Sequence, residues 1–118
     1  MKLICIVTLE PDMKMLAAER WRLMSPLYWT STRGPETIPI GFVTDRTSGY
    51  FEGKHSVASI IHDWLYKTAP CSRRQADRIM LDGMRFLRVN RFRRWIIYRA
   101  LRIGGWRAWN QHRKSEEL

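Results

Sequence analysis

The sequence predicts an α+β fold, in which short N-terminal β-strands pack on a C-terminal part of three helices. Before residue 54, apolar residues come in short runs rich in β-branched and aromatic types, and proline and glycine separate these runs. From residue 54 onward, apolar residues recur every three to four positions, which is the period of a helix that buries one face. A chain of 118 residues can bury one core, so we expect a single domain over residues 1–118.

The strand and loop part, residues 1–53, contains three candidate strands. Residues 3–7 form a compact apolar run, and residues 21–29 mix aromatics with a proline that suits an edge strand or a bulge. The intervening residues 12–20 are expected to form a short helix. A turn is predicted where serine, threonine, glycine and proline gather, just before the third candidate strand at residues 37–43. That turn covers residues 30–35.

Two helices are expected to form a hairpin in the middle of the chain. The first ends before Pro70, because a proline disfavours helical geometry in the residue that precedes it. Ser72 and Gln75 form a capping-box pattern, so the second helix begins there. Only a few residues around Pro70 and Cys71 join the two helices, so we expect them to pack antiparallel. Their apolar positions are Val57, Ile60, Ile61, Trp64 and Leu65, and then Ala76, Ile79, Met80, Gly83 and Leu87.

A third helix completes the helical part, residues 54–110. Asn90 fits an N-cap position, because its short polar side chain can accept a hydrogen bond from the first backbone N–H groups of a helix. Gly104 and Gly105 are expected to end or kink this helix. A polar tail, residues 111–118, follows.

The hairpin places a histidine opposite an aspartate. His62 lies some six residues before the end of the first helix, and Asp77 lies five residues past the cap of the second. At about 1.5 Å per residue, both lie roughly 8 to 9 Å from the turn, so they can face each other. Tyr66 shares the helical face of His62, whereas Asp63 is rotated by about 100°.

Two interpretations of this group are open. Asp77 and Tyr66 would orient the imidazole of His62 as a catalytic general base, with the other ring nitrogen free to activate a water, and Asp63 would be available for a cation. Alternatively, His62 is a buried core histidine that is hydrogen-bonded. Asp63 then caps a helix or pairs with an arginine, and Asp77 forms a salt bridge with a nearby arginine.

Four segments of the chain together form a specific pattern. They are Ile38-Pro-Ile-Gly-Phe-Val-Thr-Asp45, Ala58-Ser-Ile-Ile-His-Asp-Trp-Leu-Tyr66, Ser72-Arg-Arg-Gln-Ala-Asp77 and Tyr98-Arg-Ala-Leu-Arg-Ile-Gly104. In this order they resemble the signatures of a phage and prophage family known as domain of unknown function 1353. Residues 46–49 read Arg-Thr-Ser-Gly where the family has Leu-Ala-Ser-x-Pro. The resemblance implies a small phage-encoded protein, located in the host cytoplasm or the virion, and implies no particular activity.

The hairpin also resembles the catalytic hairpin of phospholipases A2, through His62-Asp63-x-x-Tyr66 followed by Arg74-x-x-Asp77. The resemblance implies that His62 is the general base, with Tyr66 and Asp77 as its support, and that Asp63 is a ligand of a calcium ion. The glycine-rich calcium loop and the cysteines of that family have no counterpart here.

Calcium requires several oxygen ligands, so Asp63 alone would make a weak site. Asp45 and the backbone of residues 49–53 are the candidates for the remaining ligands. A divalent cation at Asp63 and Asp45 is therefore an expectation that depends on the conformation of this loop.

The charge of the chain favours a phosphate-bearing partner. The 21 Lys and Arg residues exceed the 11 Asp and Glu residues, which leaves a formal net charge of +10. Most of this charge lies in residues 85–114, interleaved with aromatics, so this region could lie on an anionic membrane or follow a nucleic-acid backbone. Alternatively, the arginines only face water or pair with acids. In that case an apolar set packs on the hairpin, namely Trp95, Ile96, Tyr98 and Leu101.

Other features narrow the functional classes. Cys5 and Cys71 lie far apart in the sequence and predict neither a disulfide framework nor a zinc site. The apolar run at residues 3–7 is too short for a transmembrane segment or a signal peptide. The family resemblance and the His62 cluster together imply a phage accessory protein with a His-Asp hydrolase-like site that acts on a phospholipid or another phosphoester. The alternatives are a non-enzymatic virion, tail or host-interaction protein, and a nucleic-acid binder.

Overall fold

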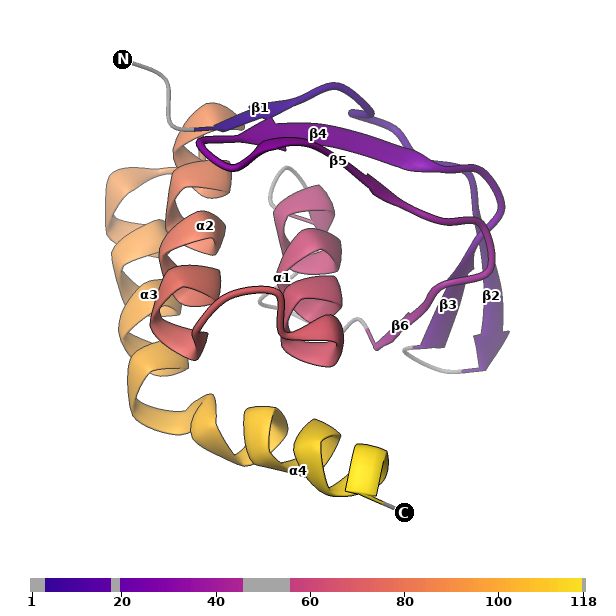
Figure 1. Ribbon diagram of the computed structural model, residues 1–118. Helices are drawn as coiled ribbons and strands as arrows, with labels where there is room; N and C mark the ends of the chain where they lie inside the picture. Colours follow the sequence, from indigo (N-terminus) through magenta and orange to yellow (C-terminus); the bar gives the residue numbers. More distant parts are fainter. Residues whose placement is uncertain (1–3, 18–19, 46–55, 118) are drawn as a thin grey trace.

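The computed structural model describes residues 4–17, 20–45 and 56–117, and within these residues six strands precede four helices (Figure 1). This order confirms the α+β class. The strands form two antiparallel three-stranded sheets, with the orders β1-β4-β5 and β2-β3-β6. They are β1 (Ile4–Ile6), β2 (Met13–Ala17), β3 (Arg20–Leu23), β4 (Leu27–Ser31), β5 (Gly34–Ile38) and β6 (Val43–Asp45).

In the first sheet, one face of strand β4 packs toward the helices. Leu27 and Trp29 of this strand are buried, whereas Tyr28 between them is about half exposed, which is the alternation of a strand with one face on the core. The predicted turn at residues 30–35 is confirmed as the hairpin between β4 and β5, although the strands extend into it as far as Ser31 and Gly34.

The sequence prediction of a short helix over residues 12–20 is wrong, because Met13–Ala17 form strand β2 and Arg20 begins strand β3, while residues 18–19 lie outside the described part of the chain. Met13 pairs with Leu23 and Met15 pairs with Trp21 in an antiparallel ladder with β3. These backbone hydrogen bonds come from a partner strand, so the local helix preference of methionine and leucine does not decide the conformation.

Two other predicted strands are each divided in two. Residues 21–29 contain the end of β3 and the start of β4, with Pro26 in the connection between them. Residues 37–43 contain the end of β5 and the start of β6. Between these two strands, Gly41 has a φ of +95°, a conformation that glycine adopts without steric cost.

The helices begin and end close to the predicted residues. They are α1 (Ser56–Thr68), α2 (Arg73–Phe86), α3 (Arg91–Gly104) and α4 (Trp106–Glu117). Ser72 and Gln75 form the expected capping box, and the side chain of Asn90 accepts hydrogen bonds from Phe92 and Arg93. The region predicted as a polar tail, residues 111–118, instead continues α4 as far as Glu117.

The helices stack in a regular order beside the sheets (Figure 1). Helices α1 and α2 form the hairpin, α3 packs on the outer side of α2, and α4 crosses below the hairpin against α1. At the hairpin interface, a Cβ atom added to Gly83 would lie only 3.1 Å from Cβ of Ala58, so glycine permits close packing of the two helices. None of the helices in the described residues is long and apolar enough to span a membrane.

The core lies between the first sheet and the helical hairpin. Its fully buried members include Leu23, Leu27, Trp29, Ile38, Ile60, Ile61 and Leu65. On α3, Ile97 is the residue that packs inward, whereas Trp95 is 57% exposed. Trp95 therefore does not pack on the hairpin as one of the sequence interpretations expected, because the rotation of α3 brings Ile97 to α2.

Candidate functional site

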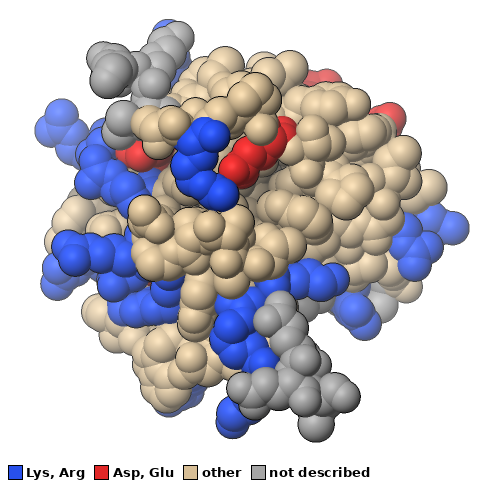
Figure 2. Space-filling model, viewed as in Figure 1, with Lys and Arg blue, Asp and Glu red and all other residues tan. Residues whose placement is uncertain are grey.

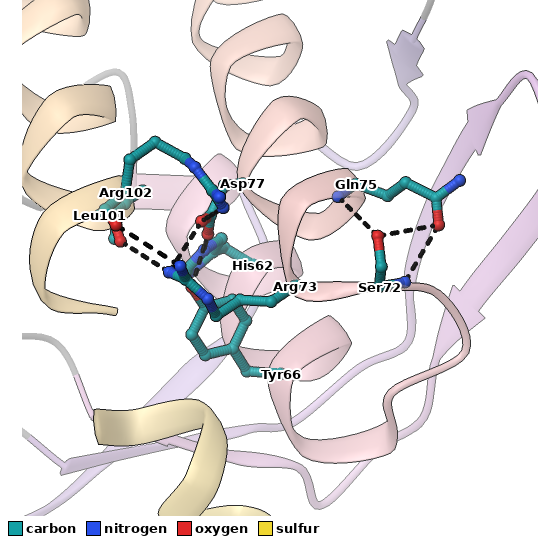
Figure 3. A network of polar contacts seen from close by, with 8 residues as sticks. All are labelled: His62, Tyr66, Ser72, Arg73, Gln75, Asp77, Leu101 and Arg102. Carbon is teal, nitrogen blue, oxygen red and sulfur yellow. Dashed lines mark hydrogen bonds and ion pairs between the residues drawn. The ribbon is translucent and has the colours of Figure 1, made fainter. Parts of the chain in front are cut away.

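The carboxylate of Asp77 lies at the centre of a polar cluster between α1 and α2 (Figure 3). Asp77 is fully buried, and its Oδ1 atom lies 2.7 Å from Nε2 of His62. The hydroxyl of Tyr66 donates to the same oxygen over 2.5 Å. The structure thus brings together His62 and Asp77, which the sequence placed at matching heights, and Tyr66, which it placed on the helical face of His62.

Two arginines contact the other oxygen of Asp77. Nη1 of Arg102 donates to Oδ2 over 2.7 Å, and Nη1 of Arg73 lies 3.4 Å from the same atom. Arg73 also donates to the backbone carbonyl of Leu101 over 3.0 Å. The cluster therefore connects α1, α2 and α3.

The electrostatics of the cluster fix its protonation states. Burial alone would raise the pKa of Asp77, but hydrogen bonds from His62, Tyr66 and Arg102 outweigh burial, and the net pKa is lowered. For Tyr66, burial is the largest cause and the adjacent Asp77 adds to it, so the pKa of the hydroxyl is raised well above its ordinary value. At neutral pH, Asp77 is ionised and Tyr66 is protonated.

This state of Asp77 also fixes the tautomer of His62. An ionised carboxylate can only accept hydrogen bonds, so Nε2 of His62 carries the proton that points at Asp77. In the neutral ring, Nδ1 then carries the lone pair. The ring is 7% exposed and lies 4.2 Å, centroid to centroid, from the ring of Tyr66. The cluster therefore has the arrangement of an oriented histidine base.

Asp63 belongs to a separate contact on a neighbouring face of α1. The hydroxyl of Thr44, which is buried in β6, donates to Oδ2 of Asp63. This is the rotation away from Asp77 that helical geometry predicts for the next residue. Asp63 thereby faces the strand that leads into residues 46–53.

The second expected cation ligand cannot be placed. Asp45 ends β6, and its side chain and residues 46–53 lie outside the described part of the chain. Within the described part, no three His, Cys, Asp or Glu side chains lie close enough together to hold a metal ion. The calcium site, with Asp63 and Asp45 as its ligands, stays a prediction.

Helix α4 closes the cluster from below. The ring of Trp109 meets that of Tyr66 edge to face at 5.2 Å, and Arg113 stacks 4.7 Å above Trp109. Nη2 of Arg113 donates to the backbone carbonyls of Tyr66 and Lys67 over 2.7 and 2.8 Å. These bonds satisfy carbonyl groups that the end of α1 leaves without helical partners.

Gly105 allows α4 to approach this closely. A Cβ atom at Gly105 would lie 2.5 Å from the Tyr66 hydroxyl and 3.1 Å from Nη1 of Arg73. Sequence reasoning recognised Gly105 only as a helix breaker, and it missed the roles of Trp109 and Arg113. The one available sequence signal was the adjacent pair of glycines, because glycine often marks a close approach of two backbones or side chains.

Comparison with known proteins gives one match. A family model described as a protein of unknown function (DUF1353) matches residues 21–101. This range includes α1 and α2. It also includes three of the four residues that contact the Asp77 carboxylate, and the fourth, Arg102, lies one position beyond it. No curated protein and no solved structure gives a significant match.

Proposed function

We infer a function from the chemistry of the site, because this chain belongs to the DUF1353 family and that family is described only as of unknown function. The proposed activity is hydrolysis of an ester with His62 as general base. A phospholipid is the proposed substrate, and another phosphoester is the second substrate class. A phage or prophage origin is also proposed, on the resemblance of the four sequence segments.

The contact between His62 and Asp77 carries the proposal. With Nε2 donating to Asp77, Nδ1 can take a proton from a water molecule, and the resulting hydroxide attacks the carbonyl carbon of the ester. The tetrahedral intermediate then expels the alkoxide, and the imidazolium returns the proton to this leaving group. Tyr66 holds the carboxylate in place throughout, because its own hydroxyl stays protonated.

Asp77 acts on His62 more through orientation than through charge. Arg73 and Arg102 offset much of the negative charge that would otherwise stabilise an imidazolium. The carboxylate still fixes the tautomer and the plane of the ring, which a general base requires before it can abstract a proton along a defined direction.

A calcium ion is the proposed cofactor. Asp63 would supply one carboxylate, and Asp45 with backbone groups of residues 49–53 would supply the other oxygens. Such an ion would polarise the ester carbonyl and stabilise the negative charge that develops on its oxygen. The contact with Thr44 holds Asp63 in one orientation before any ion binds.

The test is release of fatty acid from phospholipid vesicles in the presence of calcium. Exchange of His62 for Gln should lower the rate by about 10² to 10⁴, which is the usual contribution of a general base. His112→Gln, a change of the same type on α4, should leave the rate unaltered. Removal of calcium with a chelator should abolish the release.

A chromogenic phosphodiester tests the second substrate class with the same variants. The wild-type chain should hydrolyse one of the two substrates. If it hydrolyses neither, or if His62→Gln keeps the wild-type rate on both, His62 is not a general base.

A second candidate is a non-enzymatic virion, tail or host-interaction protein in which the cluster is structural. The observation that favours it is the pairing of both oxygens of Asp77, which accept hydrogen bonds from side chains of three helices. It predicts no hydrolysis by the wild-type chain and a lowered melting temperature for Asp77→Asn. Thermal unfolding and the vesicle assay on the same samples distinguish the two candidates.

A further inference from the structure

The outer face of α3 exposes large apolar side chains. Phe92 and Ile103 are each 71% exposed and Trp95 is 57% exposed. Steps of three and four residues through Arg99 link them, so they lie on one side of the helix, opposite the buried Ile97. Soluble proteins rarely leave several large apolar side chains together on one helix face, so this face, which we call the α3 face, requires a partner.

The α3 face is also strongly basic. Helix α3 carries five arginines and no acidic residue. The guanidinium of Arg99 lies 5.6 Å from the ring centroid of Trp95, and at the start of α4 Arg107 lies 5.3 Å from that of Trp106. Figure 2 shows Lys and Arg side chains gathered over the part of the molecule where α3 and α4 lie, with few acidic side chains among them. The partner must therefore be anionic as well as apolar.

A hollow of about 310 Å³ opens at the edge of the α3 face, between α2 and α3. Trp95 forms part of its wall, so the hollow and the exposed apolar side chains are continuous. Among the described residues, its lining contains three guanidinium groups and no carboxylate. The lining consists of Leu81, Arg85, Arg91, Arg94, Trp95 and Tyr98.

The arginines of the hollow differ in how they are held. Arg94 donates to the backbone carbonyl of Val89 over 3.0 Å and is held by the protein, whereas Arg85 lies 3.6 Å from Asp82 and is about half exposed. Arg91 lies in the first turn of α3, where the helix dipole also favours an anion. A guanidinium group can donate two parallel hydrogen bonds to two oxygens of one phosphate, so a phosphate group suits this hollow.

We propose that the α3 face docks on an anionic phospholipid bilayer, with Phe92, Trp95 and Ile103 at the acyl boundary and a headgroup phosphate in the hollow. Nucleic acid explains the charge equally well, but it gives Ile103 no contact, because aliphatic side chains neither stack on bases nor read their edges. A bilayer accommodates both sets of side chains at once, because arginines meet the phosphates while apolar side chains enter the boundary below them.

Docking through the α3 face goes beyond ester hydrolysis, because Phe92, Trp95, Ile103 and the residues that line the hollow all lie outside the His62 cluster, and Arg102 is the one arginine of α3 that contacts Asp77. A chain that binds bilayers without hydrolysing them would support docking and contradict the proposed activity. A chain that hydrolyses the ester without binding anionic bilayers through this face would support the proposed activity and contradict docking.

The experiment is co-sedimentation of the full chain with phosphatidylcholine vesicles, prepared with and without phosphatidylglycerol. The chain should bind only the anionic vesicles. Phe92→Ser combined with Ile103→Ser should weaken binding about tenfold or more, because two large apolar side chains no longer leave water. The matched control is Val7→Ser combined with Ile40→Ser, which removes side chains of 62% and 61% exposure from the strand part and should leave binding intact.

The hollow has its own variant. Arg91→Gln should weaken binding more than Arg22→Gln, an exposed arginine of β3, although both remove one positive charge. All measurements are made with a calcium chelator present, so that hydrolysis does not alter the vesicles.

Three outcomes would overturn the proposal. The first is no binding to anionic vesicles. The second is unaltered binding in the apolar variant as well as in its control, which would mean that net charge alone holds the chain on the surface. The third is binding to a single-stranded oligonucleotide that Phe92→Ser with Ile103→Ser weakens as strongly as vesicle binding, which would assign the face to nucleic acid.

Discussion

A fully buried carboxylate costs free energy unless hydrogen-bond donors replace the water it has lost. Asp77 meets this condition with donors from His62, Tyr66, Arg73 and Arg102. Every donor depends on the negative charge, so the cluster holds together only while Asp77 is ionised. Loss of this charge should affect three helices at once.

Exchange of Asp77 for Asn should therefore lower the free energy of unfolding by about 2 to 4 kcal/mol, because an amide cannot accept from all the donors and leaves two guanidinium groups without a counter-charge. Urea unfolding monitored by circular dichroism gives this difference.

Asp82→Asn is the matched control on the same helix. The partners of Asp82, Arg78 and Arg85, are about half exposed, so their ion pairs contribute little and the cost should stay near 1 kcal/mol or less. If the two variants lose the same free energy, the Asp77 cluster is not a particular source of stability.

The pH dependence of stability follows from the lowered pKa of Asp77. A group whose pKa is lower in the folded state stabilises the fold above its unfolded pKa, and this contribution is lost as the pH falls through the folded value. The difference in unfolding free energy between the wild type and Asp77→Asn should thus be constant above about pH 5 and shrink below about pH 4. Urea titrations at several pH values measure it, and a difference that stays constant down to pH 2 would contradict the lowered pKa.

The sequence predicts the facing residues of the cluster but not all its members. His62, Tyr66 and Asp77 could be placed because the short connection between two helices fixes their relative heights. Arg102 could not, because it lies 25 residues beyond Asp77 on a helix whose rotation depends on tertiary packing. The contact of Thr44 with Asp63 was missed for the same reason, since it joins a strand to a helix 19 residues away.

At the scale of elements, the junction of α3 and α4 depends on two adjacent glycines with different surroundings. A Cβ atom at Gly105 meets the Tyr66 hydroxyl at 2.5 Å, whereas one at Gly104 meets nothing within 4 Å. Gly105→Ala should cost about 1 to 3 kcal/mol, because the cluster must move to make room. Gly104→Ala should be neutral or stabilise by up to about 1 kcal/mol, because alanine favours a helix.

Thermal unfolding of these two variants measures the difference. Hydrolysis in the vesicle assay gives a second readout, and it should fall for Gly105→Ala alone. If Gly104→Ala is the more damaging change, the close approach at Gly105 does not limit the junction.

The C-terminus of α2 contains an arginine in a left-handed conformation. Arg88 has a φ of +61°, and the backbone N–H groups of Arg88 and Val89 donate to the carbonyls of Arg85 and Met84, which is the Schellman pattern. Arg88→Gly should stabilise the chain by about 0.5 to 1 kcal/mol, because glycine adopts this conformation without a steric cost. Arg88→Ala removes the same charge but keeps the strain, so its stability in urea should equal that of the wild type.

Helix boundaries were predictable because caps are local. Ser72, Gln75 and Asn90 each act on backbone groups within three residues, and the proline after Ala69 acts on its neighbour. Strand β2 was not predictable, because its conformation depends on a ladder with β3 and a bulge between Met15 and Ala17. The extension of α4 was missed because a polar sequence gives no periodic signal even when contacts such as that of Arg113 hold it in place.

At the scale of the whole molecule, the net charge of +10 opposes compaction. Added salt screens this repulsion over a Debye length that falls to about 8 Å at 0.15 M. The melting temperature should therefore rise by a few degrees between about 0.01 and 0.3 M sodium chloride. The double variant Arg93→Glu with Arg107→Glu, at two exposed positions, should raise it at low salt and respond less to added salt. A melting temperature that falls with salt would mean that favourable ion pairs outweigh the repulsion.

The overall α+β order was predictable because the change of apolar period near residue 54 is a property of the sequence alone. The division of the strands into two sheets was not, because each sheet contains one pair of strands that are not consecutive in the chain: β1 pairs with β4, and β3 pairs with β6. Such pairings depend on how distant segments meet, which periodicity does not record.

The hairpin of α1 and α2 has a consequence for the order of folding. The partners of Asp77 in this hairpin, His62 and Tyr66, are only 15 and 11 residues away along the chain, so closing these contacts costs little loop entropy. The sheets require pairings across longer stretches, such as Ile4 with Ser31. We expect the imidazole to meet its carboxylate in an early helical nucleus, before Arg102 and the strands arrive, and folding rates of Asp77→Asn would record this as a slower folding step.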